Sequence, residues 1–448
     1  MEKREISLDE SIKNIVGKFI DYSAEKEIVV VSHFDTDGIT SAAIMAKTLK
    51  RLDKRFSVKI VKSLSPEIIN KLPKDKIILF LDLASGSLSH IQEANLEKVF
   101  IIDHHELPIE SETLADEIEM INPQLNGKEK ISSAGLVYLF CKEIDSSNID
   151  LAKLAVLGMI GDLMDKEIEN LDNGNLLSEA DITKRSGLMI YPATRPLNRA
   201  LEYCSQPYIP GVTGNSEGAI ELLRESGIEP INKRYKNLIE LTEEEMKKLV
   251  TGIMLRNPKA HRDITGDIFL IKFFNKMEDA RELSARINAC SRLGQSDTAL
   301  RFCMEVPKAK KEAEEIHAKY KQHIISGLQF ASEAEKISGK GFVILNAEQN
   351  IKDTVIGTIA SILSNSLSYD EGTVIIALAH YEDKIKVSAR SVGNTGRNVR
   401  KVLDSVVREI GGEVGGHEFA AGCNISIEHE KRFIDLIKKN FEVELIKV

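Results

Sequence analysis

Three apolar runs near the start of this chain each end abruptly in acidic or imidazole side chains, and this pattern constrains the fold more than any other feature. The runs are residues 28–31, Ile77–Leu81 and residues 99–102, and their composition is typical of strands buried on both faces. A further strand is predicted at Phe56–Val61, and segments such as 39–52 have the apolar spacing of helices. Strands that alternate with helices predict an α/β fold with a doubly wound, mostly parallel sheet.

Polar side chains at the ends of these strands belong to one edge of the sheet, because the carboxyl ends of parallel strands lie together and ligands bind there. If the chain leaves the first strand extended, alternate side chains share a face, so the acids and the imidazole of SHFDTDG converge on one point. Gly38 allows the backbone to turn sharply there. The residues that follow the strands are His33, Asp35, Asp37, Asp82, Asp103, His104 and His105.

A further acid, Asp162, follows the apolar segment 151–160, where Gly158 and Gly161 allow a close approach. Each pair of carboxylates at ~4 Å costs about 1 kcal/mol in water and about 4 kcal/mol at an effective dielectric near 20. Taken singly, each acid is equally well explained as a helix cap or a surface residue, but their repetition at strand ends favours a cation site. Oxygen ligands with one imidazole suit Mn²⁺ or Mg²⁺, and two ions bridged by a carboxylate would satisfy this many ligands.

Composition limits the class of protein. The 448 residues are enough for two or three domains with separate cores, and 42% hydrophobic and 29% charged residues are typical of a soluble globular chain. The net charge of −9 argues against a uniformly basic nucleic-acid-binding surface, although a local basic groove is compatible with it.

Location is predicted from what the chain does not contain. No apolar run approaches the roughly 18–20 residues that cross a bilayer, and the N-terminal MEKREISLDE has no signal-peptide core. The five cysteines form no CxxC pair. We therefore expect a cytoplasmic protein with reduced cysteines, no zinc site and no membrane partner.

The motifs themselves carry a family resemblance. SHFDTDG, FLDLASG, IIDHHEL and GMIGDLMD resemble the four motifs of the DHH phosphoesterase superfamily, and GGHEFAAG at 415–422 resembles the signature of the associated DHHA1 domain. Their order and spacing are similar to those of the RecJ-like branch, especially its archaeal members, which include nucleases that associate with the replisome. INACSRLG at 287–294 also resembles a stretch characteristic of archaeal RecJ-like proteins.

The resemblance implies two bound Mn²⁺ or Mg²⁺ ions. It implies that Asp82 bridges the ions and, with His104, belongs to the catalytic set. His33 precedes the DxD motif by two residues, whereas some branches place a ligand histidine four residues before it, so His33 is either a ligand or a supporting group. The expected metal ligands are His33, Asp35, Asp37, Asp82, His104 and Asp162.

Two neighbours of these ligands receive other roles from the resemblance. Asp103 is expected to orient His104, as carboxylates beside metal-bound imidazoles do. His105 is expected to face the substrate phosphate and to donate to a scissile or leaving oxygen. His105 is therefore included among the catalytic residues.

A second substrate-binding region is expected near the C-terminus. The glycines Gly415 and Gly416 would let backbone N–H groups approach a phosphate or a nucleic-acid end, and His417 would contact the phosphate. Arg390 and Ser391 match the position that holds a terminal phosphate in relatives, and arginine suits bidentate phosphate binding.

Four regions are predicted along the chain. Residues 1–200 form the DHH catalytic domain, 201–305 an inserted or linking α/β domain, 306–337 a solvated linker helix, and 338–448 a smaller mixed α/β DHHA1 domain that binds substrate. Arg286 and Arg292, within the inserted region, are candidates for a nucleic-acid groove or for ordinary surface residues.

The resulting functional hypothesis is a metal-dependent exonuclease that digests single-stranded DNA from 5′ to 3′, with RNA as a further substrate, in replication or repair. Bacterial RecJ carries an additional OB domain that has no counterpart after GGHEFAAG here, so a replisome or helicase partner is expected. One alternative is an oligoribonuclease or cyclic-dinucleotide phosphodiesterase. The other is a replisome scaffold with residual nuclease activity, although such scaffolds lose metal ligands and every motif acid is present here.

Overall fold

The computed structural model describes residues 7–107, 115–126, 130–174, 176–179, 181–204, 207–258, 264–366 and 368–443. They divide into two compact units, Met1–Gly187 with Asp267–His317, and Leu188–Gly266 with Ala318–Val448. The region 201–305, expected as one inserted domain, is therefore shared between the units on either side of residue 266. The N-terminal residues 1–6, which entered the signal-peptide argument, lie outside the described residues.

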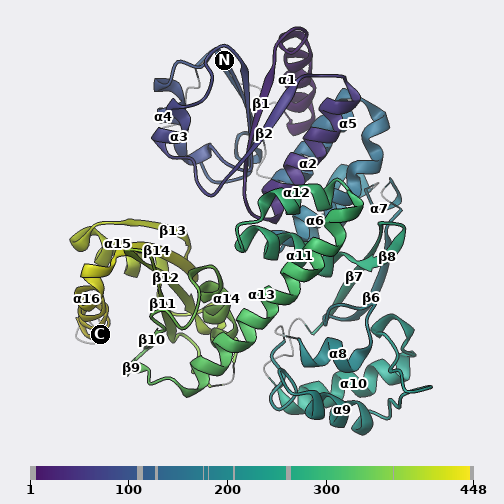
Figure 1. The fold of residues 1–448 in the computed structure, drawn as a ribbon, viewed down its shortest axis with the longest axis vertical. Helices are drawn as coiled ribbons and strands as arrows, with labels where there is room; N and C mark the ends of the chain where they lie inside the picture. The colour runs from purple at the N-terminus through teal and green to yellow at the C-terminus, as the bar shows by residue number, and fades with distance from the viewer. Residues whose placement is uncertain are drawn as a thin grey trace. The chain divides into compact units, whose positions relative to one another are not determined.

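The first unit is built on a five-stranded parallel sheet with the order β2-β1-β3-β4-β5. Figure 1 shows β1 and β2 of this sheet with α1, α2 and α5 on one side and α3 and α4 on the other. Its elements are α1 (Leu8–Tyr22), β1 (Ile28–His33), α2 (Thr36–Arg51), β2 (Phe56–Val61), α3 (Pro66–Asn70), β3 (Ile77–Leu81), α4 (Leu88–Glu93), β4 (Lys98–Ile102), β5 (Ile118–Ile121), α5 (Ser133–Ile144), α6 (Ala152–Gly161) and α7 (Leu176–Glu179). The predicted strands are confirmed, and so is the parallel arrangement.

Two apolar layers cover the two faces of this sheet. Alternate residues of β1, such as Ile28 and Val30, join a core with α1, α2, α5 and α6, whereas Val29 and Val31 join a second core with α3 and α4. Period-two alternation in a strand buried on both sides produces this division. The doubly wound architecture predicted from the sequence is therefore confirmed.

The chain turns directly from β1 into α2, and the expectation of an extended backbone through Asp37 is wrong. Asp35 is the N-cap of α2, its side chain accepts the N–H of Gly38 at 3.0 Å, and Asp37 lies in the first helical turn. A Cβ at Gly38 would lie 2.3 Å from the carbonyl oxygen of His33, so glycine is required at this position. The DxDG motif is thus a helix start whose acids occupy different positions around the turn.

A second sheet, with the order β6-β7-β8, is formed by β6 (Thr183–Leu188), β7 (Thr265–Phe273) and β8 (Lys276–Asp279), and all but three residues of these strands belong to the first unit. The first unit also contains α11 (Ala280–Arg292) and α12 (Ser296–Cys303). The predicted helix at 279–293 is α11. Arg286 on this helix is 2% exposed and lies 2.8 Å from Glu282, so the interpretation of Arg286 as a groove residue is wrong. A buried arginine needs such an acidic partner.

The long helix α13 (Pro307–Glu333) begins in the first unit and ends in the second. The remaining elements of the second unit are α8 (Leu197–Glu202), α9 (Ser216–Glu225), α10 (Glu243–Arg256), β9 (Ile337–Gly339), β10 (Phe342–Asn346), α14 (Asp353–Ser364), β11 (Val374–Tyr381), β12 (Lys384–Ser391), α15 (Val399–Ile410), β13 (Glu413–His417), β14 (Ala420–Ser426) and α16 (Glu430–Val443). Strands β13-β14-β12-β11-β10-β9 form one mixed sheet in that order.

GGHEFAAG is part of a β-hairpin made by β13 and β14, because its small residues pair in register across the two strands. Helix α15 begins at Val399, where Asn398 caps it, and Gly396, two residues before the cap, has a φ of 87°.

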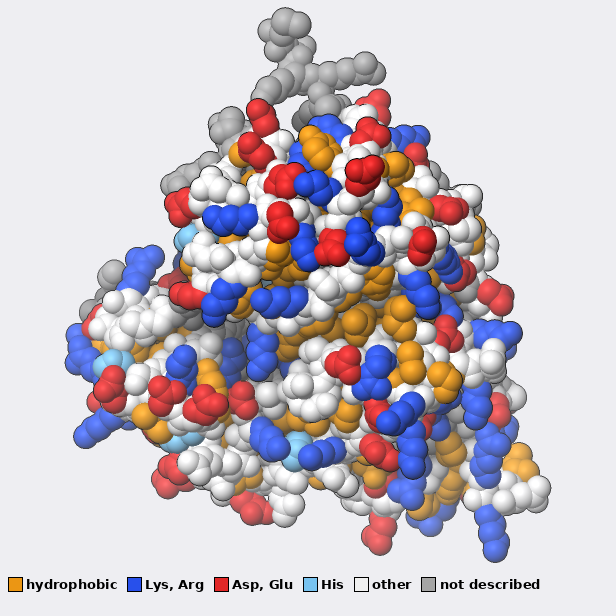
Figure 2. Space-filling view, turned by 45° about the horizontal axis from the view of Figure 1, so that its top comes forward, with side chains coloured by type: hydrophobic (Ala, Val, Ile, Leu, Met, Phe, Trp, Pro, Cys, Tyr) orange, Lys and Arg blue, Asp and Glu red, His pale blue; other side chains and the backbone are white. Residues whose placement is uncertain are grey.

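Lys and Arg side chains are interspersed with Asp and Glu over the face drawn in Figure 2, in keeping with a net charge of only −9. Within the described residues, no helix has the length and apolar character needed to cross a membrane. All five cysteines are buried, and none of them forms a disulfide.

We expect Gly158→Ala to destabilise the protein and Gly17→Ala to stabilise it, although both glycines lie inside helices. A Cβ at Gly158 would lie 2.4 Å from the Cβ of Ala134 and 2.6 Å from Oδ1 of Asp37, whereas nothing lies within 4 Å of a Cβ at Gly17. Overpacking costs about 1–3 kcal/mol, and the helix propensity of alanine contributes about 0.8–1 kcal/mol at the open site. Urea unfolding of the two variants measures both effects, and equal stability of the variants would contradict this packing.

Candidate active site

The order of the parallel sheet reverses between β1 and β3, and their carboxyl ends form a switch point of the kind where α/β folds bind ligands. β1 ends at His33, β3 ends directly before Asp82, and the neighbouring β4 is followed by residues 103–105. The strand ends that the sequence predicted to meet at one edge therefore do so.

Asp82 is the buried centre of this edge. Its φ of 59° lies in the left-handed region, and neither carboxylate oxygen has a hydrogen-bond partner among the described residues. Burial, and then repulsion from Asp35 and Asp37, raises the pKa of Asp82 well above its usual value. A buried carboxylate without donors is costly unless a cation neutralises it, so its chemistry fits a metal ligand.

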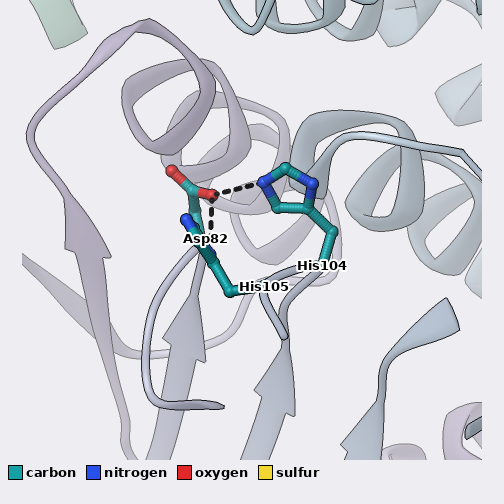
Figure 3. A group of neighbouring side chains, drawn as sticks. All are labelled: Asp82, His104 and His105. Carbon is teal, nitrogen blue, oxygen red and sulfur yellow. Dashed lines mark ion pairs between the residues drawn. The ribbon is translucent and has the colours of Figure 1, made fainter. Parts of the chain in front are cut away.

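Three imidazoles surround the carboxylate of Asp82. Nδ1 of His33 lies 3.4 Å from its Oδ2, Nε2 of His104 lies 3.6 Å from its Oδ1, and Nδ1 of His105 lies 4.0 Å from its Oδ1. Figure 3 shows His104 and His105, from the segment after β4, converging on this one side chain.

His33, Asp35 and Asp82 form one group whose ligand atoms lie within 4.8 Å of one another. Nδ1 of His33 is 2.9 Å from Oδ2 of Asp35. Burial opposes ionisation of Asp35, but the hydrogen bond and charge of His33 and the N–H of Gly38 outweigh it and hold the pKa of Asp35 below its usual range. His33 is therefore close enough to share an ion with both acids.

Asp37, His104 and Asp162 form a second such group. Nε2 of His104 lies 3.1 Å from Oδ2 of Asp162 and 4.0 Å from Oδ2 of Asp37. Burial opposes protonation of His104, but Asp162 and Asp37 outweigh it and raise its pKa to about 9. Burial and the charge of Asp162 raise the pKa of Asp37 to about 7. Without bound cations, protons on these groups reduce the repulsion between the acids.

Asp103 does not contact the ring of His104, so its expected role in orienting that imidazole is wrong. Oδ1 of Asp103 lies 2.7 Å from Nδ1 of His105 and also accepts the backbone N–H of His104 at 2.9 Å. The hydrogen bond to Asp103 raises the pKa of His105. Because the side chain of His105 is half exposed, it presents a held proton at the edge of the site.

A small network that the sequence did not reveal fixes this loop. The N–H of Ser85 donates to Oδ2 of Asp103 at 2.9 Å, and the buried amide of Asn122 donates to Oγ of Ser85 and to the carbonyl of His105. Asn122 follows β5, so its position after a fourth neighbouring strand was an available signal.

The segment before α5 holds Asp37. The hydroxyl of Ser132 donates to Oδ1 of Asp37 at 2.8 Å, and the N–H groups of Ser133 and Ala134 donate to Oδ2 and Oδ1 at 2.7 and 3.0 Å. The free N–H groups of a helix start favour an anion there. Gly158 then leaves room for this carboxylate, as predicted from GMIGDLMD.

Arg292 approaches the site from α11. Its guanidinium lies 5.4 Å from the ring centroid of Phe34, the residue between His33 and Asp35, and its Nε lies 3.4 Å from Oδ1 of Asn288. The side chain is otherwise exposed. An aromatic ring therefore holds a positive charge beside two of the candidate ligands.

Arg390 and Ser391, which were expected to act together, have their side chains on opposite faces of the sheet in the second unit. They are consecutive on β12 and so face opposite sides of the sheet, and the buried Ser391 donates its hydroxyl to the carbonyl of Thr395. Ser388 shares the face of Arg390, since a Cβ at Gly357 would lie 3.3 Å from Oγ of Ser388 and 3.7 Å from Nη2 of Arg390. Ser388 precedes Arg390 by two residues in KIKVSARS, so strand alternation in the sequence already predicts that the two share a face.

The hairpin brings His417 into register with Arg390, because both pair with Ala420 from either side of β14. Gly415, Gly416 and His417 are exposed. Gly416 has a φ of 114°, and a Cβ there would lie 2.4 Å from the carbonyl of Ala420. The glycine is thus needed for the hairpin itself.

Three parts of the chain match known families. Residues 27–161 match the DHH family, N-terminal domain; residues 191–262 match the DHH-CID domain; and residues 339–442 match the DHHA1 domain. An uncharacterized protein of Methanocaldococcus jannaschii, MJ0831, is 32% identical over 431 residues, which is 91% of each chain.

Solved structures show the same fold. RecJ of Thermus thermophilus in complex with Mn²⁺ is similar with a TM-score of 0.58 and 19% identity, over 97% of this chain and 54% of that chain. A manganese-bound exonuclease RecJ gives a TM-score of 0.58 and 17% identity, over 98% of this chain and 95% of that chain. CDC45 from Entamoeba histolytica gives 0.70 and 11%, over 97% and 99%.

The resemblance inferred from the motifs is thereby confirmed. Matching DHH and DHHA1 domains, a relative of nearly equal length and the fold shared with RecJ and CDC45 agree with one another. This chain belongs to the DHH/DHHA1 phosphoesterase superfamily.

Proposed function

We propose that this protein is a two-metal exonuclease that digests single-stranded nucleic acid, most readily DNA from the 5′ end. The observation that carries the proposal is the carboxylate of Asp82, buried without a hydrogen-bond donor between two groups of candidate ligands. RecJ, which shares the fold, is an exonuclease with bound manganese in one of the similar structures.

Asp82 would bridge two Mn²⁺ or Mg²⁺ ions. One ion would be held by His33 and Asp35, and the other by the second group, Asp37, His104 and Asp162. Bound there, the ions would activate the attacking water and stabilise the charge on the attacking and leaving oxygens. The side chains fit hard cations, since carboxylate oxygens and imidazole nitrogens are the donors and no cysteine is among them.

His105 supplies the proton for the leaving oxygen. Asp103 holds its Nδ1 at 2.7 Å, which leaves the other ring nitrogen for the substrate and keeps the ring protonated. Because Asp103 also accepts the N–H of Ser85, the imidazole is fixed by the loop and not by the substrate.

Phosphates are bound by cations on both units. Arg292, held over Phe34, contacts the phosphate beside the metal ions. Arg390 with Ser388, and the backbone of the hairpin at Gly415, Gly416 and His417, hold a second phosphate of the strand.

The alternative is a replisome scaffold, which the fold likeness to CDC45 keeps open. At 11% identity that likeness concerns the fold alone, whereas the intact set of acids favours catalysis. A pull-down with catalytically inactive protein would test for stable partners, and robust metal-dependent cleavage would rule out a purely structural role.

We expect purified protein with Mn²⁺ to shorten a long single strand labelled at its 3′ end and to release a mononucleotide at once from a 5′-labelled strand. EDTA or Asp82→Asn should abolish this cleavage, whereas Asp53→Asn should not. Asp53 is a suitable control because it is an aspartate outside the site with a similar φ of 52°. Rapid cleavage of dinucleotides with inert long strands would instead identify a small-substrate phosphodiesterase.

We expect Asp82→Asn to stabilise the metal-free protein in EDTA by about 1 kcal/mol or more. The substitution removes a buried carboxylate without a hydrogen-bond donor, and asparagine tolerates the left-handed backbone. The same variant should lose the stabilisation that Mn²⁺ gives the wild type. Urea unfolding in EDTA and in Mn²⁺ measures both, with Asp53→Asn unchanged in each. Destabilisation of the chelated variant would contradict the role given to Asp82.

The stability of the chelated wild type should fall as pH rises from about 5 to 9. The pKa of Asp82 is higher in the folded protein than in the unfolded chain, so the folded state is favoured while Asp82 is protonated and loses this stabilisation as pH rises. The pKa of His104 is raised to about 9 and therefore acts in the same direction. Mn²⁺ should oppose this slope, because the ligands bind it when deprotonated. Unfolding free energies at three pH values test the sign, and a rise with pH in EDTA would contradict it.

His105→Asn and His104→Asn should differ in kind. Both should lower kcat by about 100-fold or more. Only His104→Asn should also weaken Mn²⁺ binding, since His104 belongs to two candidate ligand groups, whereas Nδ1 of His105, which shares one of them with Asp82 and His104, is already bound to Asp103. Calorimetric titration with Mn²⁺ separates the two roles. Equal loss of metal by both variants would make His105 a ligand.

A further inference from the structure

Helix α6 ends in a Schellman motif immediately after the candidate ligand Asp162. The N–H of Met164 donates to the carbonyl of Met159 at 2.8 Å, and the N–H of Leu163 donates to that of Ile160 at 3.2 Å. This pair of bonds places Leu163 at the position where the chain must be left-handed, and its φ is 58°. Glycine normally occupies this position, because a side chain there is strained.

Leu163 gains nothing from folding that would offset this strain. Its side chain is 84% exposed, the highest value for a large hydrophobic side chain among the described residues. Most other non-glycine residues with positive φ are polar, as is usual for such turns, and Ala84 and Phe274 are at least partly buried. A leucine that is both strained and exposed is therefore poorly explained by stability.

Leu163 directly follows the candidate ligand Asp162, so its Cα is about 3.8 Å from that of Asp162. Oδ2 of Asp162 lies 3.1 Å from Nε2 of His104. The chain thus places an exposed apolar residue next to a member of a group of charged and polar side chains, and that group alone would recognise only the phosphate. Apolar contact suits the face of a nucleobase attached to that phosphate.

We propose that Leu163 is a substrate-positioning contact that packs against the nucleobase next to the scissile phosphate. The inference rests on the proposed function and adds to it, since it gives the metal site a means to recognise a nucleoside as well as a phosphodiester. A large apolar residue is kept exposed at a left-handed position where the helix could otherwise end in glycine.

The test combines stability with steady-state kinetics on a single-stranded oligonucleotide in Mn²⁺. Leu163→Gly should raise the melting temperature by about 2 °C, because it relieves the backbone, and should raise KM about fivefold or more. Leu163→Asn, which also tolerates the left-handed region, should raise KM similarly, whereas Leu163→Met should keep the wild-type value. Leu255→Asn, which removes another leucine that is 79% exposed, should leave KM unchanged.

An abasic nucleotide beside the scissile phosphate supplies the matching change in the substrate. With that substrate the difference between wild type and Leu163→Gly should disappear, and Mn²⁺ affinity should be equal for both proteins throughout. Wild-type KM in Leu163→Gly and Leu163→Asn, in a protein that cleaves the strand, would overturn the inference and leave the proposed function standing. A lower melting temperature for Leu163→Gly would assign Leu163 to the fold, and an inactive wild type would remove both proposals.

Discussion

Repulsion among carboxylates at the switch point of the parallel sheet is the constraint on which the first unit depends. Asp82 lies at its centre with no hydrogen-bond donor, and Asp35, Asp37 and Asp162 lie around it in groups that share His33 and His104. Protons can reduce this repulsion, which is why the pKa values of Asp82 and His104 are raised. Two divalent cations would neutralise this repulsion more completely, and without them the surrounding fold has to hold the acids close together.

That scaffold uses helix ends. Asp35 caps α2, and Asp37 accepts N–H groups at the start of α5, so two of the acids lie where helix dipoles favour negative charge. Asp162 is the exception, because it follows the C-terminal end of α6, where an anion is disfavoured. In the metal-free protein the nearby imidazole of His104 offsets the negative charge of Asp162, and in the metal-bound protein a cation would offset it. The acids are therefore held with unequal support, and Asp82 and Asp162 depend most on the metal.

The sequence predicted the features that follow from local patterns. Apolar runs ending in acids revealed the sheet, its edge and the residues that meet there, because burial on both faces demands continuous apolar strands. The sequence did not reveal which acid supports which imidazole: Asp103 holds His105, since the loop after β4 folds back on Ser85 and Asn122. It also misjudged Ser391, although strand alternation alone separates that residue from Arg390. The sequence therefore does not reveal contacts between distant segments, such as those that fix Asp103, whereas strand alternation in the sequence is enough to separate Ser391 from Arg390.

Backbone strain gathers at the same edge. Asp82 and Ala84 both have positive φ, at 59° and 101°, in the turn after β3, and Leu163 has 58° in the turn after α6. Only the last of these side chains is exposed, so only its strain leaves a side chain free to meet another molecule. For Asp82 the left-handed backbone turns a carboxylate inward, among three imidazoles. The same kind of strain thus occurs at one buried carboxylate of the candidate metal site and at one exposed apolar residue next to another candidate ligand, and neither would persist if stability alone selected these residues.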